Sequence, residues 1–364
     1  MKISKVTCIV HRDLSSPVTA ALADARILHS AVQSGRSVVL RERKRLFGLT
    51  STTVLEDDPV DIYRIYVKPR SSDALLALLG AKADLATPGR GTVYCQDVDI
   101  ESVPVRFVNP GNVTRPAAAP TPVSDLMGIC CIVQRGQAGP VIRSILESGS
   151  VPTITFGEGM GVRDKLGLMR IAIPAEKEIV NAVVTRYDAE QVMNILIDVG
   201  RLDQPGKGFI YLYPIRKGFI NTKTHRGQRA QGASTEQIVA AIDHLKGSSE
   251  WRKMEAVVSA SGPRRYLRDL TNFSLLTNDG RAMDIVQAAM SMGAPGATIS
   301  RYRQNAQRPN APSIAREMSD IIVGRSQLDQ LRQTVREAGL FHEEASGLIE
   351  KETVPLACTY LGAK

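Results

Sequence analysis

The sequence predicts an α+β chain of three tandem ferredoxin-like (split βαβ) units, and two internal repeats lead to that prediction. Cys8-Ile-Val-His-Arg12 recurs 123 residues later as Cys131-Ile-Val-Gln-Arg135. Thr87-Pro-Gly-Arg-Gly91 recurs 117 residues later as Gln204-Pro-Gly-Lys-Gly208, and the apolar positions of the 26 residues before it coincide at the same spacing without a gap. Because several segments repeat in the same order, the chain is expected to repeat one supersecondary unit.

Each unit is expected to run strand, helix, strand, strand, helix, strand, on the basis of alternation in strands and i, i+3, i+4 spacing in helices. In the first unit the elements are Lys5–His11, Ser16–Ala25, Ala31–Leu40, Asp61–Lys68, Ser72–Gly80 and Thr92–Val98. In the second they are Gly128–Gln134, Gly139–Ser148, Thr153–Phe156, Glu178–Arg186, Ala189–Val199 and Phe209–Ile215. In the third, more degenerate unit they are Phe273–Thr277, Arg281–Met292, Ala297–Arg303, Asp320–Arg325, Ser326–Ala338 and Val354–Tyr360.

The predicted domain organisation has three domains and two connectors. The domains are residues 1–108, 126–224 and 268–364. Residues 109–125 are rich in proline and alanine and are expected to form an extended linker. Residues 225–267 are a basic linker in which a capping-box pattern predicts a helix from Ser234 to about Lys246.

Composition limits the classes of function. Lysine and arginine exceed aspartate and glutamate by nine charges, which favours an anionic partner without identifying it. No apolar run reaches the roughly 18 residues of a membrane-spanning helix, so an integral membrane protein is not expected. The first residues show no secretory signal, and the five cysteines form no C-x-x-C pair. We therefore expect a cytoplasmic protein with reduced, mostly buried thiols.

Catalytic and metal-binding motifs are absent from the sequence. No G-x-x-x-x-G-K-[ST], H-E-x-x-H or G-x-S-x-G pattern occurs, and the five histidines are isolated. Gly157-x-Gly159-x-Gly161 follows a strand, but the alternating residues after it favour a mobile loop over the helix that a dinucleotide-binding fingerprint needs. We expect neither enzyme activity nor a required cofactor or metal.

The two Pro-Gly-x-Gly turns allow two interpretations. Their successive amides could form a nest for a phosphate group, with added charge near the second turn from Lys177 and Lys207. Pro-Gly is also the usual central pair of a type II turn, which needs no ligand. The sequence leaves both interpretations open.

These features resemble the PII signalling family. Thr153-Ile-Thr-Phe-Gly-Glu-Gly-Met-Gly-Val-Arg-Asp164 is similar to the family's second strand entering its T-loop, and Gly200-Arg-Leu-Asp-Gln-Pro-Gly-Lys-Gly208 is similar to its B-loop. The resemblance implies a pseudo-trimer on one chain, with ATP, ADP or another adenine nucleotide bound as effector between the units. It also implies mobile loops near Gly157–Gly167 and Arg36–Asp58 that contact a membrane transporter, a metabolic enzyme or a transcriptional regulator. Phe209 and Thr92 stand where family members that bind ATP firmly carry a basic residue.

The candidate residues follow from these observations. The ligand-binding set is Gly206, Lys207, Gly208, Lys177, Gly89, Arg90 and Gly91. The partner-binding set is Gly157, Gly159, Gly161, Arg163, Lys165, Arg41, Arg43, Lys44 and Arg45.

The basic run Arg41–Arg45 is open to three interpretations: a solvated surface, a docking site for a protein or a nucleic-acid contact. Nucleic acid is the least favoured because Phe47 is the only aromatic residue beside it. The function expected overall is a non-enzymatic regulator that senses a small anion, cytoplasmic or held at a membrane by its protein partner. The rival hypothesis is a constitutive structural subunit of a larger assembly without a ligand switch.

Overall fold

The computed structural model describes residues 1–44, 51–102, 108–109, 113–117, 119–161, 176–226, 264–305 and 314–361. The linker helix predicted from Ser234 lies outside these residues. Among the described ones, no helix is long and apolar enough to cross a membrane.

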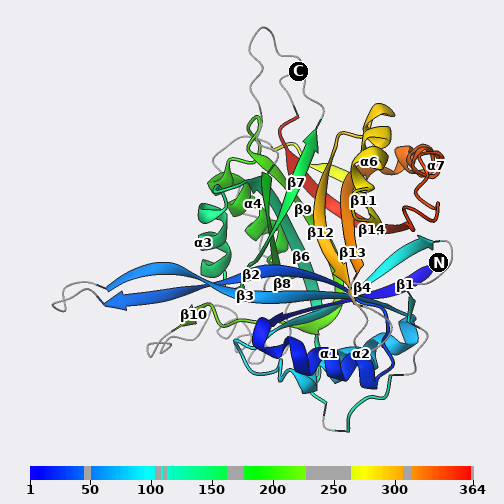
Figure 1. Ribbon diagram of the computed structural model, residues 1–364. Helices are drawn as coiled ribbons and strands as arrows, with labels where there is room; N and C mark the ends of the chain where they lie inside the picture. Colours follow the sequence, from blue (N-terminus) through cyan, green and yellow to red (C-terminus); the bar gives the residue numbers. More distant parts are fainter. Residues whose placement is uncertain are drawn as a thin grey trace.

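Three segments of the chain contain the same succession of elements (Figure 1). The first has β1 (Lys2–His11), the 3₁₀ helix η1 (Arg12–Leu14), α1 (Ser15–Asp24), β2 (Ala31–Lys44), β3 (Ser51–Val67), α2 (Pro69–Lys82) and β4 (Gly91–Ser102). The second has β6 (Val123–Gln134), α3 (Gly139–Glu147), β7 (Thr153–Gly161), β8 (Glu176–Thr185), α4 (Ala189–Gly200) and β9 (Gly208–Phe219). The third has β11 (Leu267–Asn278), α6 (Ala282–Ser291), β12 (Gly296–Gln304), β13 (Ile314–Gly324), the 3₁₀ helix η3 (Arg325–Gln327), α7 (Leu328–Glu337) and β14 (Leu348–Thr359).

The predicted fold class, three tandem ferredoxin-like domains forming a pseudo-trimer, is wrong. The strands of all three segments belong to one 14-stranded sheet. Ten of them close into an antiparallel barrel, and four further strands are attached to it. The local order of elements was readable from the sequence, but the pairing between edge strands of different segments was not, because an edge strand offers the same backbone groups to any partner.

Two junctions connect the segments within this sheet. On one side β4 pairs with β9 along Val93–Cys95 and with β14 along Asp99–Ser102, while β9 and β14 also pair with each other. On the other side β2, β7 and β12 pair with one another over short stretches. Each segment thus contributes its second strand to one junction and its last strand to the other.

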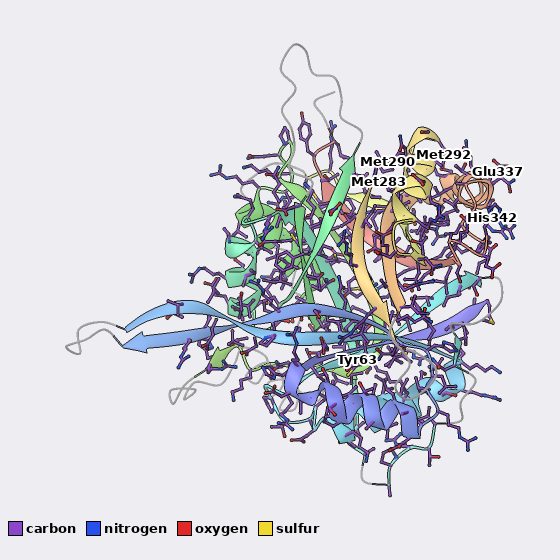
Figure 2. All side chains as sticks on the ribbon, viewed as in Figure 1. Tyr63, Met283, Met290, Met292, Glu337 and His342 are labelled. Atoms are coloured by element: carbon purple, nitrogen blue, oxygen red, sulfur yellow. The ribbon has the colours of Figure 1, made fainter. Side chains whose placement is uncertain are left out.

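The helices cover apolar clusters, one for each segment. In α3 the buried residues Val141, Ile142, Ile145 and Leu146 recur at helical spacing and pack on β6 and β8. Tyr63 of β3, labelled in Figure 2, lies in the corresponding cluster of the first segment. Its hydroxyl is 3.1 Å from the Thr19 Oγ1 atom of α1, so β3 and α1 are tied by a polar contact as well as by packing.

A buried ionic cluster connects the first and third segments. The Lys5 Nζ atom of β1 lies 2.5 Å from Glu350 and 3.3 Å from Glu352 of β14. Burial alone would lower the pKa of Lys5, but the two carboxylates raise it, so the lysine is charged. The Tyr66 hydroxyl donates to Glu350 at 2.5 Å. Because removing one member would leave an unpaired buried charge, the cluster holds β14 in register with β1 and β4.

Two segments predicted as loops are largely strand. The excursion expected between Arg36 and Asp58 is a long hairpin of β2 and β3, paired from Ala31 with Arg64 to Lys44 with Ser51. Figure 1 shows this hairpin projecting from the body of the molecule. Likewise β7 continues through Gly157 and Gly159 to Gly161, where the sequence predicted a mobile loop.

The two short strands lie at the starts of the predicted linkers, β5 across the boundary between the predicted first domain and its linker. β5 (Val108–Asn109) pairs with β3, and β10 (His225–Arg226) pairs with β2, both in parallel. The Asn109 side chain accepts hydrogen bonds from the amides of Leu28 and His29 and donates to the Tyr66 carbonyl. Asn109, the first residue of the predicted linker, is therefore held on the body of the molecule.

Candidate functional site

The two Pro-Gly-x-Gly turns have the same backbone geometry. The amide of Arg90 donates to the Thr87 carbonyl at 3.3 Å, and Gly89 between them has a φ of 93°. The amide of Lys207 donates to the Gln204 carbonyl at 3.3 Å, and Gly206 has a φ of 70°. A proline followed by a glycine with positive φ, closed by this hydrogen bond, is a type II turn. Both turns therefore match the structural interpretation of the sequence, which by itself requires no ligand.

The last glycine of each turn cannot be replaced by another residue without strain. Gly91 has a φ of 143° and Gly208 a φ of 147°, a region that side chains rarely adopt. A Cβ atom on Gly91 would lie 2.3 Å from the Ile9 carbonyl oxygen, and one on Gly208 would lie 2.4 Å from the Ile132 oxygen. This repeated requirement explains why the glycine pattern recurs in the sequence.

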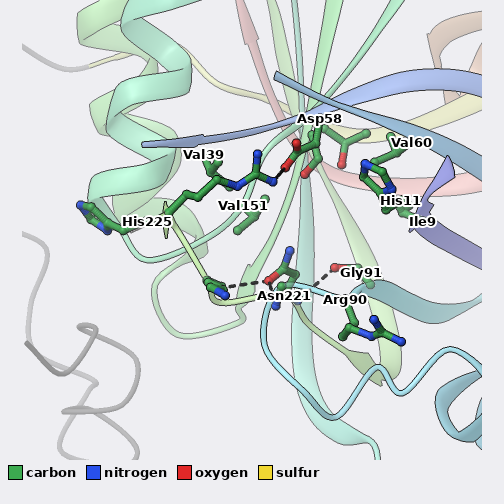
Figure 3. A pocket seen from close by; sticks show the side chains of 16 residues that line it. Ile9, His11, Val39, Asp58, Val60, Arg90, Gly91, Val151, Asn221 and His225 are labelled. Carbon is green, nitrogen blue, oxygen red and sulfur yellow. Dashed lines mark hydrogen bonds and ion pairs between the residues drawn. The ribbon is translucent and has the colours of Figure 1, made fainter. Parts of the chain in front are cut away.

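The first turn faces the chain that follows β9. The Asn221 Oδ1 atom accepts a hydrogen bond from the Gly89 amide at 2.8 Å and another from the Lys223 amide at 3.1 Å. The Asn221 amide in turn donates to the Thr92 hydroxyl at 3.0 Å. Asn221 thus occupies an amide of the first turn. Figure 3 shows dashed contacts at Asn221.

A cavity of about 90 Å³ lies at this contact. Its charged and titratable lining consists of His11, Asp58, Arg90, Lys223, His225 and Arg226. Apolar residues of the adjoining strands complete it, among them Val39, Val60 and Val151, which are labelled in Figure 3. The lysine and arginines outnumber the carboxylate, so the cavity favours an anion.

Arg226 connects the cavity to the base of the β2–β3 hairpin. Its guanidinium forms ion pairs with Asp58 and, at 3.2 Å, with Glu56, both on β3. The hydrogen bond to Asp58 raises the pKa of Arg226 above its ordinary value. Glu56 also binds Arg41 of β2 at 2.6 Å, and that hydrogen bond lowers the pKa of Glu56. The hairpin is therefore fixed at its base by charges that belong to the cavity wall.

The second turn has different neighbours. The Gln134 side chain donates to the Gly206 carbonyl at 3.0 Å, and the Thr359 hydroxyl donates to the Gly208 carbonyl at 2.9 Å. Both contacts use carbonyl oxygens of the turn, whereas Asn221 at the first turn uses an amide. Lys177 lines a second cavity together with Gly157.

The other predicted residues are scattered. Gly157, Gly159 and Gly161 lie within β7, and Arg41 lies on the exposed part of the hairpin. The backbone of Arg43 and Lys44 belongs to β2. The remaining members of the partner-binding set, Arg45, Arg163 and Lys165, lie outside the described residues.

Asn221, Arg226 and Asp58 are functional candidates that the sequence did not reveal. Asn221 carries no motif, and Asp58 lies about 30 residues before the turn that it faces across the cavity. The one available signal was the cluster of basic residues after β9, which includes Lys223. The described residues hold no group of three His, Cys, Asp or Glu side chains arranged for a metal ion.

The cysteines are buried and unpaired, as their positions in apolar strands predicted. Burial raises the pKa of Cys8 and of Cys130 to about 12. These thiols are therefore protonated at neutral pH and serve as small apolar core residues.

Comparison with known proteins does not identify a family. No family model and no curated protein matches the sequence. Among solved structures, the chain is similar to Arabidopsis thaliana PII bound to citrate, with 17% identity, 29% of this chain and 96% of that chain covered, and a TM-score of 0.20. It is also similar to aspartate kinase from Synechocystis, with 9% identity, 95% of this chain and 43% of that chain covered, and a TM-score of 0.22. At these TM-scores neither likeness carries a functional argument.

Proposed function

We propose that the chain is a non-enzymatic regulator that binds a small phosphate-bearing effector at the cavity beside the first turn. The observation that carries the proposal is the hydrogen bond from the Gly89 amide to Asn221 at 2.8 Å. The Asn221 Oδ1 atom lies where a phosphate oxygen would accept the same hydrogen bond. An anion that displaces Asn221 would thereby release the chain between Asn221 and Arg226.

The effector that we propose is an adenine nucleotide with its phosphate group in the cavity. About 90 Å³ is well below the roughly 300–1,000 Å³ of a pocket that encloses a whole small molecule. The nucleoside would therefore lie across the mouth of the cavity. Arg90 and Lys223 are exposed at that mouth and supply two positive charges for the phosphates.

Effector binding would change the contacts of the β2–β3 hairpin and so reach a protein target. Arg226 is five residues after Asn221 and pairs with Glu56 and Asp58 at the hairpin base. A phosphate near Lys223 attracts this arginine and weakens its pairs with β3. The hairpin, with Arg41 on its exposed part, is then the surface that contacts a protein target, which we expect to be a transporter or a metabolic enzyme.

The test is calorimetric titration of the full chain with ATP, ADP and inorganic phosphate. Arg90 and Lys207 occupy the same position in the two turns, so Arg90→Gln and Lys207→Gln form a matched pair. Arg90→Gln should weaken nucleotide binding by about tenfold, whereas Lys207→Gln should leave it unchanged. Absence of saturable binding would overturn the sensor and favour the constitutive structural subunit. Equal weakening of nucleotide binding by both substitutions would instead indicate that the effector does not bind specifically at the first turn.

A further inference from the structure

A second, larger cavity lies where the second strands of the three segments meet. β2 pairs with β12 through Ala31 and Val32, and with β7 through Arg36 and Ser37. β7 pairs with β12 through Glu158–Gly161. Between these short pairings the three strands separate. In the described part of the chain, residues 33–35, 155–157 and 300–302 therefore have no strand partner across the junction.

The opening between these strands has the size of a ligand pocket. Its volume is about 670 Å³, within the roughly 300–1,000 Å³ typical of small-molecule sites. Every segment contributes to its wall. The polar lining residues are Gln33, Ser34, Arg36, Arg135, Glu158, Glu176, Lys177, Arg301, Arg303 and Glu317.

The charged lining of this cavity has five cations (Arg36, Arg135, Lys177, Arg301 and Arg303) and three carboxylates (Glu158, Glu176 and Glu317), so cations outnumber carboxylates by two. Arg135 pairs with Glu176 at 2.9 Å, and Glu317 accepts the Ala282 amide at the start of α6 at 3.0 Å. Arg301 is exposed, and its guanidinium forms no hydrogen bond or ion pair with another described residue, although its backbone pairs with Glu317 across β12 and β13. Burial lowers the pKa of Lys177, another cation of the lining. The Arg301 guanidinium is thus the lining cation that a bound anion would neutralise, in a cavity that also contains the carboxylates of Glu158 and Glu317.

An aromatic ring stands between two of the arginines. The Arg36 guanidinium lies 5.3 Å from the centre of the Phe156 ring, and the Arg135 guanidinium lies 5.9 Å from it. These cation–π contacts hold both planar groups beside the opening. A guanidinium fixed in this way binds a carboxylate or phosphate with less loss of side-chain freedom.

The glycines of β7 keep the cavity walls in place. A Cβ atom on Gly157 would lie 2.8 Å from the Ile299 carbonyl oxygen, and one on Gly159 would lie 2.5 Å from the Lys177 Cε atom. The Gly-x-Gly-x-Gly pattern therefore allows β7 to approach β12 and Lys177 closely. This accounts for a motif that the sequence associated with a mobile loop.

We infer that this junction cavity binds a small organic dianion, whose carboxylate or phosphate groups are held by Arg301 and Arg303 of β12 and Arg36 of β2. Arg303 and Arg36 already pair with Asp61 at 3.4 Å and with Asp57 at 3.0 Å, whereas Arg301 has a free guanidinium among the described residues. Arg301 is therefore the principal anchor. Because the walls come from all three segments, the bound dianion connects them at one point.

The inference is tested on the full chain by calorimetric titration with succinate, malonate and glycerol 3-phosphate, with acetate as the monoanion control. At least one dianion should bind saturably at one site per chain, and acetate should bind far more weakly. Binding of the dicarboxylates alone, or of glycerol 3-phosphate alone, identifies which anionic group the cavity accepts. No saturable binding of any of the three overturns the inference.

Matched variants assign the binding to this cavity. Arg301→Gln should weaken it by about tenfold or more, and Arg301→Lys should restore part of it. Arg325→Gln removes an exposed arginine of the same segment outside the cavity and should have no effect. Arg90→Gln at the first turn should also leave dianion binding unchanged, so this inference and the nucleotide proposal can fail separately. Full affinity in Arg301→Gln would contradict the inference.

Discussion

The turns at residues 87–91 and 204–208 share a backbone but differ in their surroundings. Each has a proline, a glycine with positive φ and a final glycine pressed against a strand carbonyl. The first meets Asn221 and Lys223 after β9, whereas the second meets Gln134 of β6 and Thr359 at the end of β14. The glycines are therefore required for folding in both turns, whereas ligand binding at either turn would depend on the residues that surround it.

The difference follows from a cyclic arrangement of the segments. The first turn leads into β4, which pairs with the end of β9 at Phe219. The second leads into β9, which pairs with the end of β14 at Thr359. In the third segment Leu348 at the start of β14 pairs with Ser102 at the end of β4. The first turn therefore lies beside the end of the second segment, and the second turn beside the end of the third. These segment ends differ in sequence, so the two turns have different neighbours.

The largest expected effect is a loss of stability that both turns share. Gly91→Ala and Gly208→Ala should each lower the free energy of unfolding by more than about 3 kcal/mol. Backbone strain and a clash with a strand carbonyl add up in both variants. Urea denaturation measures this loss.

The control for this prediction is Gly206→Ala. Its φ is also positive, but no atom lies within 4 Å of the added Cβ, so only about 1 kcal/mol of strain is expected. A large loss in one of the two final-glycine variants without the other would show that the turns are not equivalent.

A smaller effect should separate the two turns. Asn221→Ala removes two side-chain hydrogen bonds at the first turn and should lower the free energy of unfolding by about 1 kcal/mol. Gln134→Ala removes one exposed hydrogen bond at the second turn and should cost about half as much or less. Thermal unfolding of the two variants compares these costs.

The same pair of variants bears on nucleotide binding. Asn221→Ala should strengthen binding because it frees the Gly89 amide, whereas Gln134→Ala should not change it. Weaker nucleotide binding in Asn221→Ala would mean that Asn221 holds the ligand rather than competing with it.

Local patterns in the sequence were sufficient to predict the repeated elements but not their assembly. The Pro-Gly-x-Gly turns, the amphipathic helices and the buried cysteines each depend on residues close together in the chain. The closed sheet depends on pairings such as Leu348 with Ser102, which no local pattern specifies. The charged side chains at the start of the β2–β3 hairpin gave it a loop-like composition, although ion pairs such as Arg36–Asp57 stabilise it as strands.

The sequence likewise predicted only those parts of the candidate site that depend on local patterns. Gly89, Arg90 and Gly91 were predicted from the repeat, and all three line the first cavity. Asn221 and Arg226 were missed because their roles arise from contacts across 132 and 168 residues. In the second cavity Lys177 and Gly157 were predicted as parts of two different sites, and only the β7–β8 pairing brings them together.

The smallest predicted effect concerns the contact between β4 and the third segment, where ion pairs join Glu101 to helix α7. Glu101 near the end of β4 accepts two hydrogen bonds from Arg332 of α7, at 2.6 and 3.0 Å, and Arg336 lies 3.2 Å away. Burial alone would raise the pKa of Glu101, but the hydrogen bonds and charges of the two arginines lower it. A carboxyl group with a lowered pKa stabilises the fold above its unfolded pKa and loses that contribution as the pH falls through its folded pKa.

Glu101→Gln should therefore lower the free energy of unfolding by about 0.5–1 kcal/mol at pH 7, since water screens the partly exposed arginines. The difference from the unsubstituted chain should shrink as the pH is lowered from about 5 to 3. Glu337→Gln is the control for losing an exposed carboxylate, because Glu337 accepts its hydrogen bond from Gln333 rather than from an arginine. If the Glu101→Gln difference stayed constant down to pH 3, the contact between β4 and the third segment would depend on strand pairing alone. It would then resemble the second turn, where Gln134 and Thr359 form neutral hydrogen bonds, rather than the first, whose cavity is lined by charge.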